Sequence, residues 1–284
     1  MVFCLCGGCL MRSLALALGA GGARGLAHIA VFEALDELGI KPVAIAGSSI
    51  GAVAGAVYGA GMSGKAIRRY VVDLFHNRGD VWRRLMLTRA GTIGDMFNGN
   101  FAAAVRLDAE KLVAQFLADL VPDDFAALGI PLTVVASNLY GRREATFSSG
   151  PLKPALAASI ALPTIMRPVV LGERVLIDGG ATNPLPFDLL RGRADIIVAV
   201  DISGPPADDR KDVPNAIESL YATVLVMTSA IINEKLKHDV PDLLVQPNVG
   251  AFRGLDFFQA SAILRVAEAA KTDLKAKLEA LLGL

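Results

Sequence analysis

Ser49 is the residue of this chain whose surroundings most favour chemistry. It stands third in the segment Gly-Ser-Ser-Ile-Gly at positions 47–51, which fits the G-x-S-x-G pattern of a nucleophile elbow. The apolar run Val43–Ala46 before it predicts a strand, and the small residues after it predict a helix. Gly47 and Gly51 lack the side chains that would collide in so sharp a turn. The pattern predicts that Ser49 projects from a strand-to-helix turn as a nucleophile, and it gives Ser48 no chemical role.

Asp178 is the carboxylate best placed to act as a base. It follows a predicted strand, Val175–Ile177, and precedes Gly179 and Gly180, so its side chain emerges at a strand end where backbone can approach closely. A carboxylate within hydrogen-bond reach of Ser49 can accept the serine proton if desolvation raises its pKa toward the working pH. The alternative is an aspartate that only caps its own turn.

A histidine is the other candidate base, and the chain has three histidines. His28 lies early in a predicted helix, where a packed or capping role is expected, and His76 lies beside an arginine-bearing segment. Only His238 completes a Ser–Asp–His order, as Ser49, Asp178 and His238. An α/β-hydrolase places its elbow after several strands, whereas here the elbow follows the second. The dyad is therefore favoured, and the triad remains the alternative.

A glycine-rich loop at positions 19–25 follows the first predicted strand, Ser13–Leu18. The dinucleotide fingerprint G-x-G-x-x-G requires glycine where Arg24 stands, which argues against a nucleotide site. A strand–loop–helix unit also presents backbone N–H groups at a helix N-terminus, where they stabilise negative charge. The loop is predicted to be either an oxyanion hole or a tight turn that lets helix and sheet pack closely.

The elements that must position these residues alternate between strand-like and helix-like segments, which is typical of an α/β fold with a mostly parallel sheet covered by helices. Further strands are predicted at 132–137, 145–148, 169–171, 195–201 and 243–246. A long helix is predicted up to about Asp239 and another over Gln259–Leu282, while the stretch 77–100 is predicted to be irregular. No repeat or change in composition divides residues 13–284, so we expect one domain.

Composition excludes several classes of protein. Lys plus Arg and Asp plus Glu number 28 each, which leaves no positive excess for binding nucleic acid. Glycines, serines and charges interrupt the most apolar stretches, so none reaches the about 20 apolar residues of a membrane span. Cys4, Cys6 and Cys9 lack a fourth cysteine for a closed zinc site. We expect residues 1–12 to be an extension without stable structure, and the rest to be a cytoplasmic protein.

Four motifs in this order resemble the patatin-like phospholipases. They are GGARG at 21–25 with AHIAV at 27–31, AGSSIGA at 46–52, ASIALP at 158–163 with RPV at 167–169, and DGG at 178–180. The resemblance extends over about 14–201. One departure is Ala20, because the family usually has three consecutive glycines here; alanine keeps the N–H donor but disfavours positive φ.

The resemblance implies a three-layer α/β/α fold with the elbow after the second strand, and a Ser–Asp dyad without a catalytic histidine. Ser49 would be the nucleophile and Asp178 the base, with no metal or organic cofactor. The implied substrate is a lipid carboxylic ester, a phospholipid or lysophospholipid, cleaved through an acyl-enzyme. The other implied site residues are the oxyanion-hole segment Gly21, Gly22, Ala23 and Arg24, with Arg24 shaping the loop, and the supporting glycines Gly47, Gly51 and Gly179.

Two other functions stay open at this point. One is a soluble carboxylesterase or thioesterase that uses the dyad or the triad with His238, and the other is a lipid-binding regulatory protein without activity. The segment Arg78–Arg89 mixes arginines with Trp82 and aliphatic residues. It is predicted to be a cover over an acyl pocket, a peripheral contact with anionic lipid headgroups, or a solvated helix with an apolar inner face.

Overall fold

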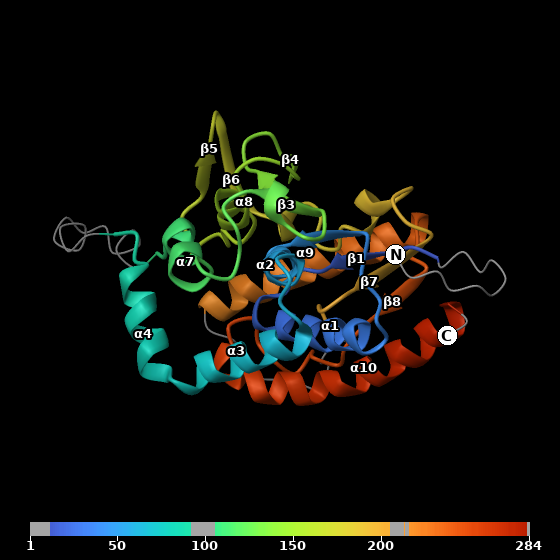
Figure 1. Ribbon diagram of the computed structural model, residues 1–284. Coiled ribbons are helices and arrows are strands. Elements are labelled where there is room, and N and C mark those ends of the chain that lie inside the picture. The colour runs from blue at the N-terminus through green and yellow to red at the C-terminus, as the bar shows by residue number, and fades with distance from the viewer. Residues whose placement is uncertain (1–11, 92–105, 205–212, 214–215, 283–284) are drawn as a thin grey trace.

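The computed structural model of the protein describes residues 12–91, 106–204, 213 and 216–282. The predicted N-terminal extension therefore lies outside the described residues, apart from Arg12. Within them the chain folds into a central sheet with helices on both faces, as the alternating pattern predicts (Figure 1).

The sheet has eight strands, seven of them in the order β5-β6-β3-β2-β1-β7-β8, with β4 paired to β3. The pairs among β3, β2, β1, β7 and β8 are parallel, and those of β3 with β4 and β6, and of β5 with β6, are antiparallel. The sheet is thus mostly parallel with an antiparallel end. The strands are β1 Leu14–Leu18, β2 Ala44–Ser48, β3 Leu132–Asn138, β4 Arg143–Phe147, β5 Val169–Leu171, β6 Arg174–Asp178, β7 Ile196–Val200 and β8 Leu243–Val245.

Alternation of large and small residues along β1 decides what covers each face of the sheet. Leu14, Leu16 and Leu18 point to one face, and alanines at 15 and 17 point to the other. The leucine face packs in one apolar core with α1 (His28–Glu37), α2 (Ile50–Gly59), α8 (Leu152–Ser159) and α10 (Ala260–Leu282). The alanine face is covered by a short 3₁₀ helix, Phe187–Leu190, and by α9 (Ala216–His238), whose Ile232 packs into the same apolar cluster.

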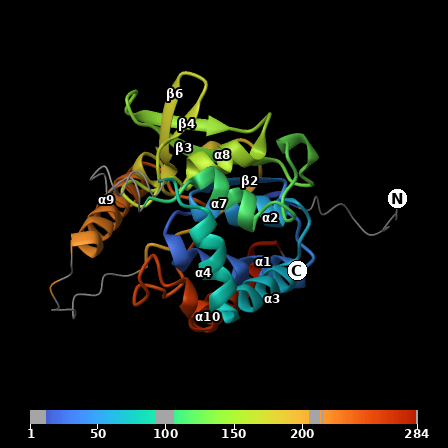
Figure 2. The same ribbon diagram turned by 90° about the vertical axis from the view of Figure 1, so that its left-hand side faces the viewer.

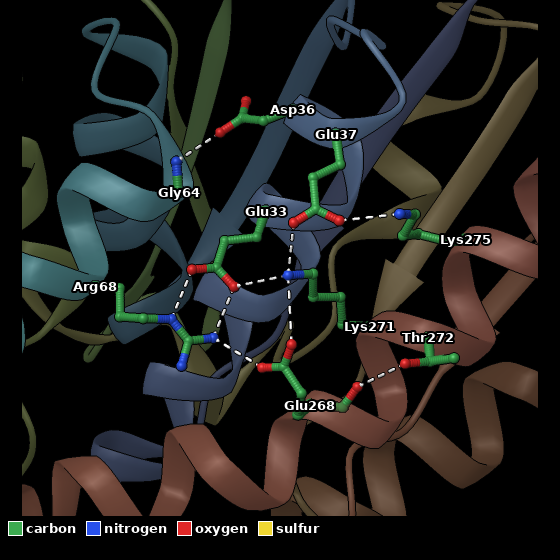
Figure 3. A network of polar contacts seen from close by, with 9 residues as sticks. All are labelled: Glu33, Asp36, Glu37, Gly64, Arg68, Glu268, Lys271, Thr272 and Lys275. Atoms are coloured by element: carbon green, nitrogen blue, oxygen red, sulfur yellow. Dashed lines mark hydrogen bonds and ion pairs between the residues drawn. The ribbon is translucent and has the colours of Figure 1, made fainter.

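Three helices on the leucine side are joined by one polar network (Figure 3). Glu33 of α1 is 3% exposed and accepts two hydrogen bonds from the Arg68 guanidinium of α3 (Gly64–His76), at 2.6 and 2.7 Å. Lys271 of α10 contacts Glu33 at 3.4 Å and Glu37 at 2.7 Å. Ion pairs from Arg68 and Lys271 to the glutamates of α1 thus hold α3 and α10 against α1.

One prediction for the middle of the chain is wrong in part. The segment expected to be irregular from residue 77 begins with a helix, α4 (Arg78–Leu87), because the Asn77 side chain accepts a hydrogen bond from the N–H of Asp80 and caps it. Residues 92–100 lie outside the described residues, and the next helix that the structure describes is α7 (Ala109–Phe116). None of the described helices is long and apolar enough to cross a membrane.

Candidate active site

Ser49 occupies a strained turn between β2 and α2. Its backbone has φ 55° and ψ −124°, a conformation that a residue with a side chain adopts only when its surroundings enforce it. The enforcement comes from close packing: a Cβ on Gly51 would lie 2.2 Å from the Leu18 carbonyl oxygen, and one on Gly47 would lie 2.6 Å from the Ala52 nitrogen. Both glycines of the motif are therefore sterically required by this elbow.

Asp178, the last residue of β6, is hydrogen-bonded to the elbow. Ser49 Oγ donates to Asp178 Oδ2 at 2.5 Å, and the N–H of Gly180 donates to Asp178 Oδ1 at 2.7 Å. Burial raises the pKa of the Asp178 carboxyl from its ordinary value to about 6, while these two hydrogen bonds oppose the rise. The carboxylate thus lies within reach of the serine proton and has the basicity to accept it near neutral pH.

Strand β3 brings the two ends of this pair together. Its residue Val135 pairs with Ser48 of β2, and its next residue, Ala136, pairs with Asp178 of β6. The elbow and the carboxylate therefore sit at successive positions along one strand. A Cβ on Gly179 would lie 2.3 Å from the Val135 carbonyl oxygen, so this glycine permits the close approach that the pairing requires.

Ser159, at the end of α8, is a further residue of the site. Its Oγ accepts a hydrogen bond from the N–H of Ser49 at 2.9 Å and donates one to the Val135 carbonyl at 2.6 Å. The side chain is completely buried. Ser159 lies in the ASIALP motif, but spacing alone gave it no role, because a lone serine in a helical stretch is a common residue.

The glycine-rich loop lies at the end of β1 and turns into a 3₁₀ helix, Gly22–Ala27. Within the described part of the chain, the N–H groups of Gly21 and Gly22 have no hydrogen-bond acceptor, whereas the N–H of Ala23 donates to the Gly254 carbonyl at 2.7 Å. The Ala23 donor is therefore already used, and Gly21 and Gly22 are the two predicted donors left for a substrate oxygen.

Arg24 holds this loop in place rather than facing a ligand. Its guanidinium donates to the carbonyl oxygens of Phe252 at 2.7 Å, Gly250 at 3.2 Å and Ser203. Ala20, the departure from the glycine triplet, fits without strain, because the described non-glycine residues with positive φ are Ser49 and two residues far along the chain, 142 and 164.

Among the described residues, no histidine is hydrogen-bonded to Ser49 or Asp178. His238 is exposed at the end of α9, where its ring contacts Glu234 at 3.2 Å, so the Ser–Asp–His triad is not assembled. His28 is buried, and its Nε2 bonds to the Gly19 carbonyl at 3.0 Å. Burial lowers the pKa of His28 to about 4, so the ring stays neutral and supports the glycine loop.

Comparison with known families gives a direct match. Residues 16–191 match the family model described as patatin-like phospholipase, which covers more than half of the chain. All of the motif residues discussed above lie within the matched range.

Curated relatives agree with this match. The chain is 37% identical over 222 residues to an uncharacterized NTE family protein of Mycobacterium tuberculosis, covering 78% of this chain and 58% of the relative. It is 30% identical over 204 residues to lysophospholipase nte1 of Aspergillus fumigatus, covering 70% of this chain and 12% of that protein. The chain thus spans little more than half the length of the first of these relatives.

A solved structure shares the fold. The crystal structure of VipD from Legionella pneumophila superposes with a TM-score of 0.50 at 13% sequence identity, over 94% of this chain and 67% of that one. At this identity the likeness concerns the fold alone.

Proposed function

Because the chain belongs to the patatin-like phospholipase family, we propose that it is a serine acyl hydrolase that cleaves a carboxylic ester of a phospholipid or lysophospholipid. The observation that carries the proposal is the 2.5 Å hydrogen bond from Ser49 Oγ to Asp178 Oδ2 at a strained elbow. The lysophospholipase named among the relatives supports the lipid class of substrate.

The reaction follows from the positions of these groups. Asp178 takes the proton of Ser49 as Oγ attacks the ester carbonyl carbon, and the carbonyl electrons move onto oxygen. The N–H groups of Gly21 and Gly22, which have no acceptor among the described residues, are the candidates to stabilise that oxyanion, and one such donor is worth about 3–4 kcal/mol. The protonated Asp178 then returns its proton to the leaving alcohol, which leaves an acyl group on Ser49.

Hydrolysis of the acyl-enzyme repeats the sequence with water. Asp178 takes a proton from water, the hydroxide attacks the acyl carbon, and Ser49 leaves with the proton returned by Asp178. The products are a fatty acid and an alcohol, the latter a lysophospholipid or glycerophosphodiester according to the substrate. A peripheral contact with a membrane surface is part of this proposal, because the substrate resides there.

The experiment is turnover of a short p-nitrophenyl ester, then of lysophosphatidylcholine and phosphatidylcholine, by the wild type and three variants. Ser49→Ala and Asp178→Asn are expected to lower kcat by about 10³-fold or more, and His238→Ala is expected to retain it. Loss of activity in His238→Ala would support the triad. A folded wild type that binds lipid without hydrolysing any of the three esters would support the non-catalytic alternative.

A further inference from the structure

The first half of α9 presents an unusual outer face. Positions 219–233 contain no charged residue, and three large apolar side chains of this stretch are exposed: Leu220 at 44%, Val226 at 69% and Met227 at 61%. The outer face of α10, by contrast, carries exposed charges such as Arg265 and Glu268. A surface helix normally places charged or polar residues toward water. The first half of α9 therefore has the composition of a helix that meets an apolar medium.

Helix α4 carries a second exposed apolar set. Trp82 is 56% exposed, Met86 43% and Leu87 57%, and the spacing from Trp82 to Met86 places both on the same side of the helix. The exposed residues beside them include Arg83 and Arg89. Positions 78–89 contain four arginines and one aspartate, so this side of the molecule carries a local positive excess.

Both helices are connected to segments that carry the Ser49–Asp178 pair. Helix α9 contacts the turn Gly179–Ala181, which directly follows Asp178. Arg89, two residues beyond the end of α4, forms a bridge with Leu107, and Leu107 forms one with Met166. Met166 lies a few residues beyond Ala161, whose carbonyl accepts the N–H of Asp178. Figure 1 and Figure 2 show α4 and the free end of α9 at the same end of the molecule.

We propose that these two helices form one docking surface for an anionic phospholipid bilayer, with Trp82, Met86, Leu87, Leu220, Val226 and Met227 entering the acyl boundary. The proposal rests on the proposed function, since it brings the ester substrate to the dyad. Arg83 and Arg89 would contact lipid phosphates, for which guanidinium groups are suited. Tryptophan at the level of the headgroups is typical of such contacts.

A bilayer fits this surface better than a second copy of the chain does. A twofold contact through α4 would place the same arginines of two molecules against each other, which is unfavourable. Insertion to the boundary between headgroups and acyl chains also requires only an apolar helix face, and not a membrane-spanning length.

The chain contains one tryptophan, so Trp82 is a native reporter of binding. Wild type is titrated with vesicles of phosphatidylcholine alone, of phosphatidylcholine with phosphatidylglycerol, and of the second mixture with brominated acyl chains. The emission of Trp82 is expected to shift to the blue with the anionic vesicles and to be quenched by the brominated ones. An emission spectrum that no vesicle changes would overturn the proposal.

Variants locate the surface. Val226→Asp combined with Met227→Asp is expected to weaken partition into anionic vesicles by about tenfold or more, because two apolar side chains no longer leave water. Val240→Asp is the matched control, since Val240 is equally aliphatic and 63% exposed but lies beyond the end of α9. It is expected to change partition less than about twofold. Equal effects of the two replacements would overturn the proposal.

Two further measurements separate the possible outcomes. The variants at Val226, Met227 and Val240 are expected to hydrolyse a water-soluble p-nitrophenyl ester at the wild-type rate. A wild type that binds vesicles but does not hydrolyse this ester would count against the proposed function and not against the docking surface. Sedimentation at several protein concentrations tests the second copy. A dimer that Val226→Asp with Met227→Asp abolishes, without any vesicle binding by the wild type, would assign the surface to self-association and overturn the proposal.

Discussion

Ser159 Oγ accepts a hydrogen bond from the backbone N–H of Ser49 at 2.9 Å and donates one to the Val135 carbonyl oxygen at 2.6 Å. The hydroxyl thus connects the strained elbow with the strand that also pairs with Asp178. This arrangement makes Ser159 a positioning residue for the proposed nucleophile, because it contacts the backbone of Ser49 and not its Oγ.

Replacing Ser159 with alanine is expected to lower kcat by about tenfold or more while leaving KM nearly unchanged. The Ser49 N–H and the Val135 carbonyl would both lose their partner, and a small displacement of a nucleophile has a large effect on rate. Steady-state kinetics with a p-nitrophenyl ester measure the two constants, and thermal unfolding measures the accompanying loss of stability.

Ser48→Ala is the matched control, because it also replaces a buried serine with alanine, at the position directly before Ser49. Ser48 is completely buried, and its Oγ has no partner in the described part of the structure. Removing an unpaired buried polar atom is expected to leave kcat unchanged and to maintain or slightly raise the melting temperature. A similar loss of kcat in both alanine variants would contradict the positioning role of Ser159.

The pH dependence of activity is expected to follow the Asp178 carboxyl. Burial raises its pKa to about 6, and only the deprotonated form can accept the Ser49 proton. The value of kcat/KM should therefore rise about tenfold per pH unit below 6 and level off above about 7. Initial rates between pH 4.5 and 8 with a non-ionising ester measure this profile.

A histidine base would titrate in the same range, so the profile needs a control. His238→Gln is expected to keep the same midpoint, because His238 contacts Glu234 and is exposed. A midpoint that moves or disappears in His238→Gln would show that the rate depends on the histidine and would refute Asp178 as the sole base.

The same pKa makes a separate prediction about stability. A carboxyl whose pKa is higher in the folded than in the unfolded chain loses folding free energy as pH rises from about 4 to about 6. Asp178→Asn removes that ionisation, and its amide can still accept from Gly180 and donate to Ser49. The variant is expected to be more stable than wild type above pH 6, by up to about 3 kcal/mol, and to match it more closely near pH 4.

Urea denaturation of both proteins at pH 4 and pH 7.5 measures the difference. Ser49→Ala serves as the control, because it abolishes activity equally while leaving the carboxyl to ionise. A constant difference between Asp178→Asn and wild type at the two pH values would mean that the carboxyl titrates normally in the fold.

Much of this fold could be predicted from local patterns. The apolar runs at β1, β2, β3 and β7 coincide with the observed strands to within a residue or two, because buried strands of a parallel sheet read as continuous apolar stretches. The elbow at Ser49 could also be predicted, since glycines two residues before and after a serine, between a strand and a helix, are required where side chains would collide in the turn.

Relationships across the sheet could not be predicted in the same way. The pairing of Ser48 and Asp178 with successive residues of β3 depends on register, and register is set by tertiary packing. The hydrogen bond from the Ala23 N–H to the Gly254 carbonyl and that from the Ser49 N–H to Ser159 Oγ each join residues more than a hundred positions apart. Helix α4 was only one of the alternatives for Arg78–Arg89, because Trp82, Met86 and Leu87 are mixed with arginines and the pattern shows no clearly separate polar and apolar faces.

The last prediction concerns the network that fixes α3 and α10 on α1. Arg68→Met removes both hydrogen bonds to the buried Glu33 carboxylate and leaves it with Lys271 at 3.4 Å. The free energy of unfolding is expected to fall by about 2–3 kcal/mol, because a buried charge loses its closest partner. Arg83→Met is the control, since Arg83 pairs with Asp80 at the surface and its removal should leave the melting temperature unchanged. Adding Glu33→Met to Arg68→Met should restore most of the loss, because no unpaired carboxylate then remains. A double variant as unstable as Arg68→Met would show that packing by the arginine stem, rather than the carboxylate, determines the effect.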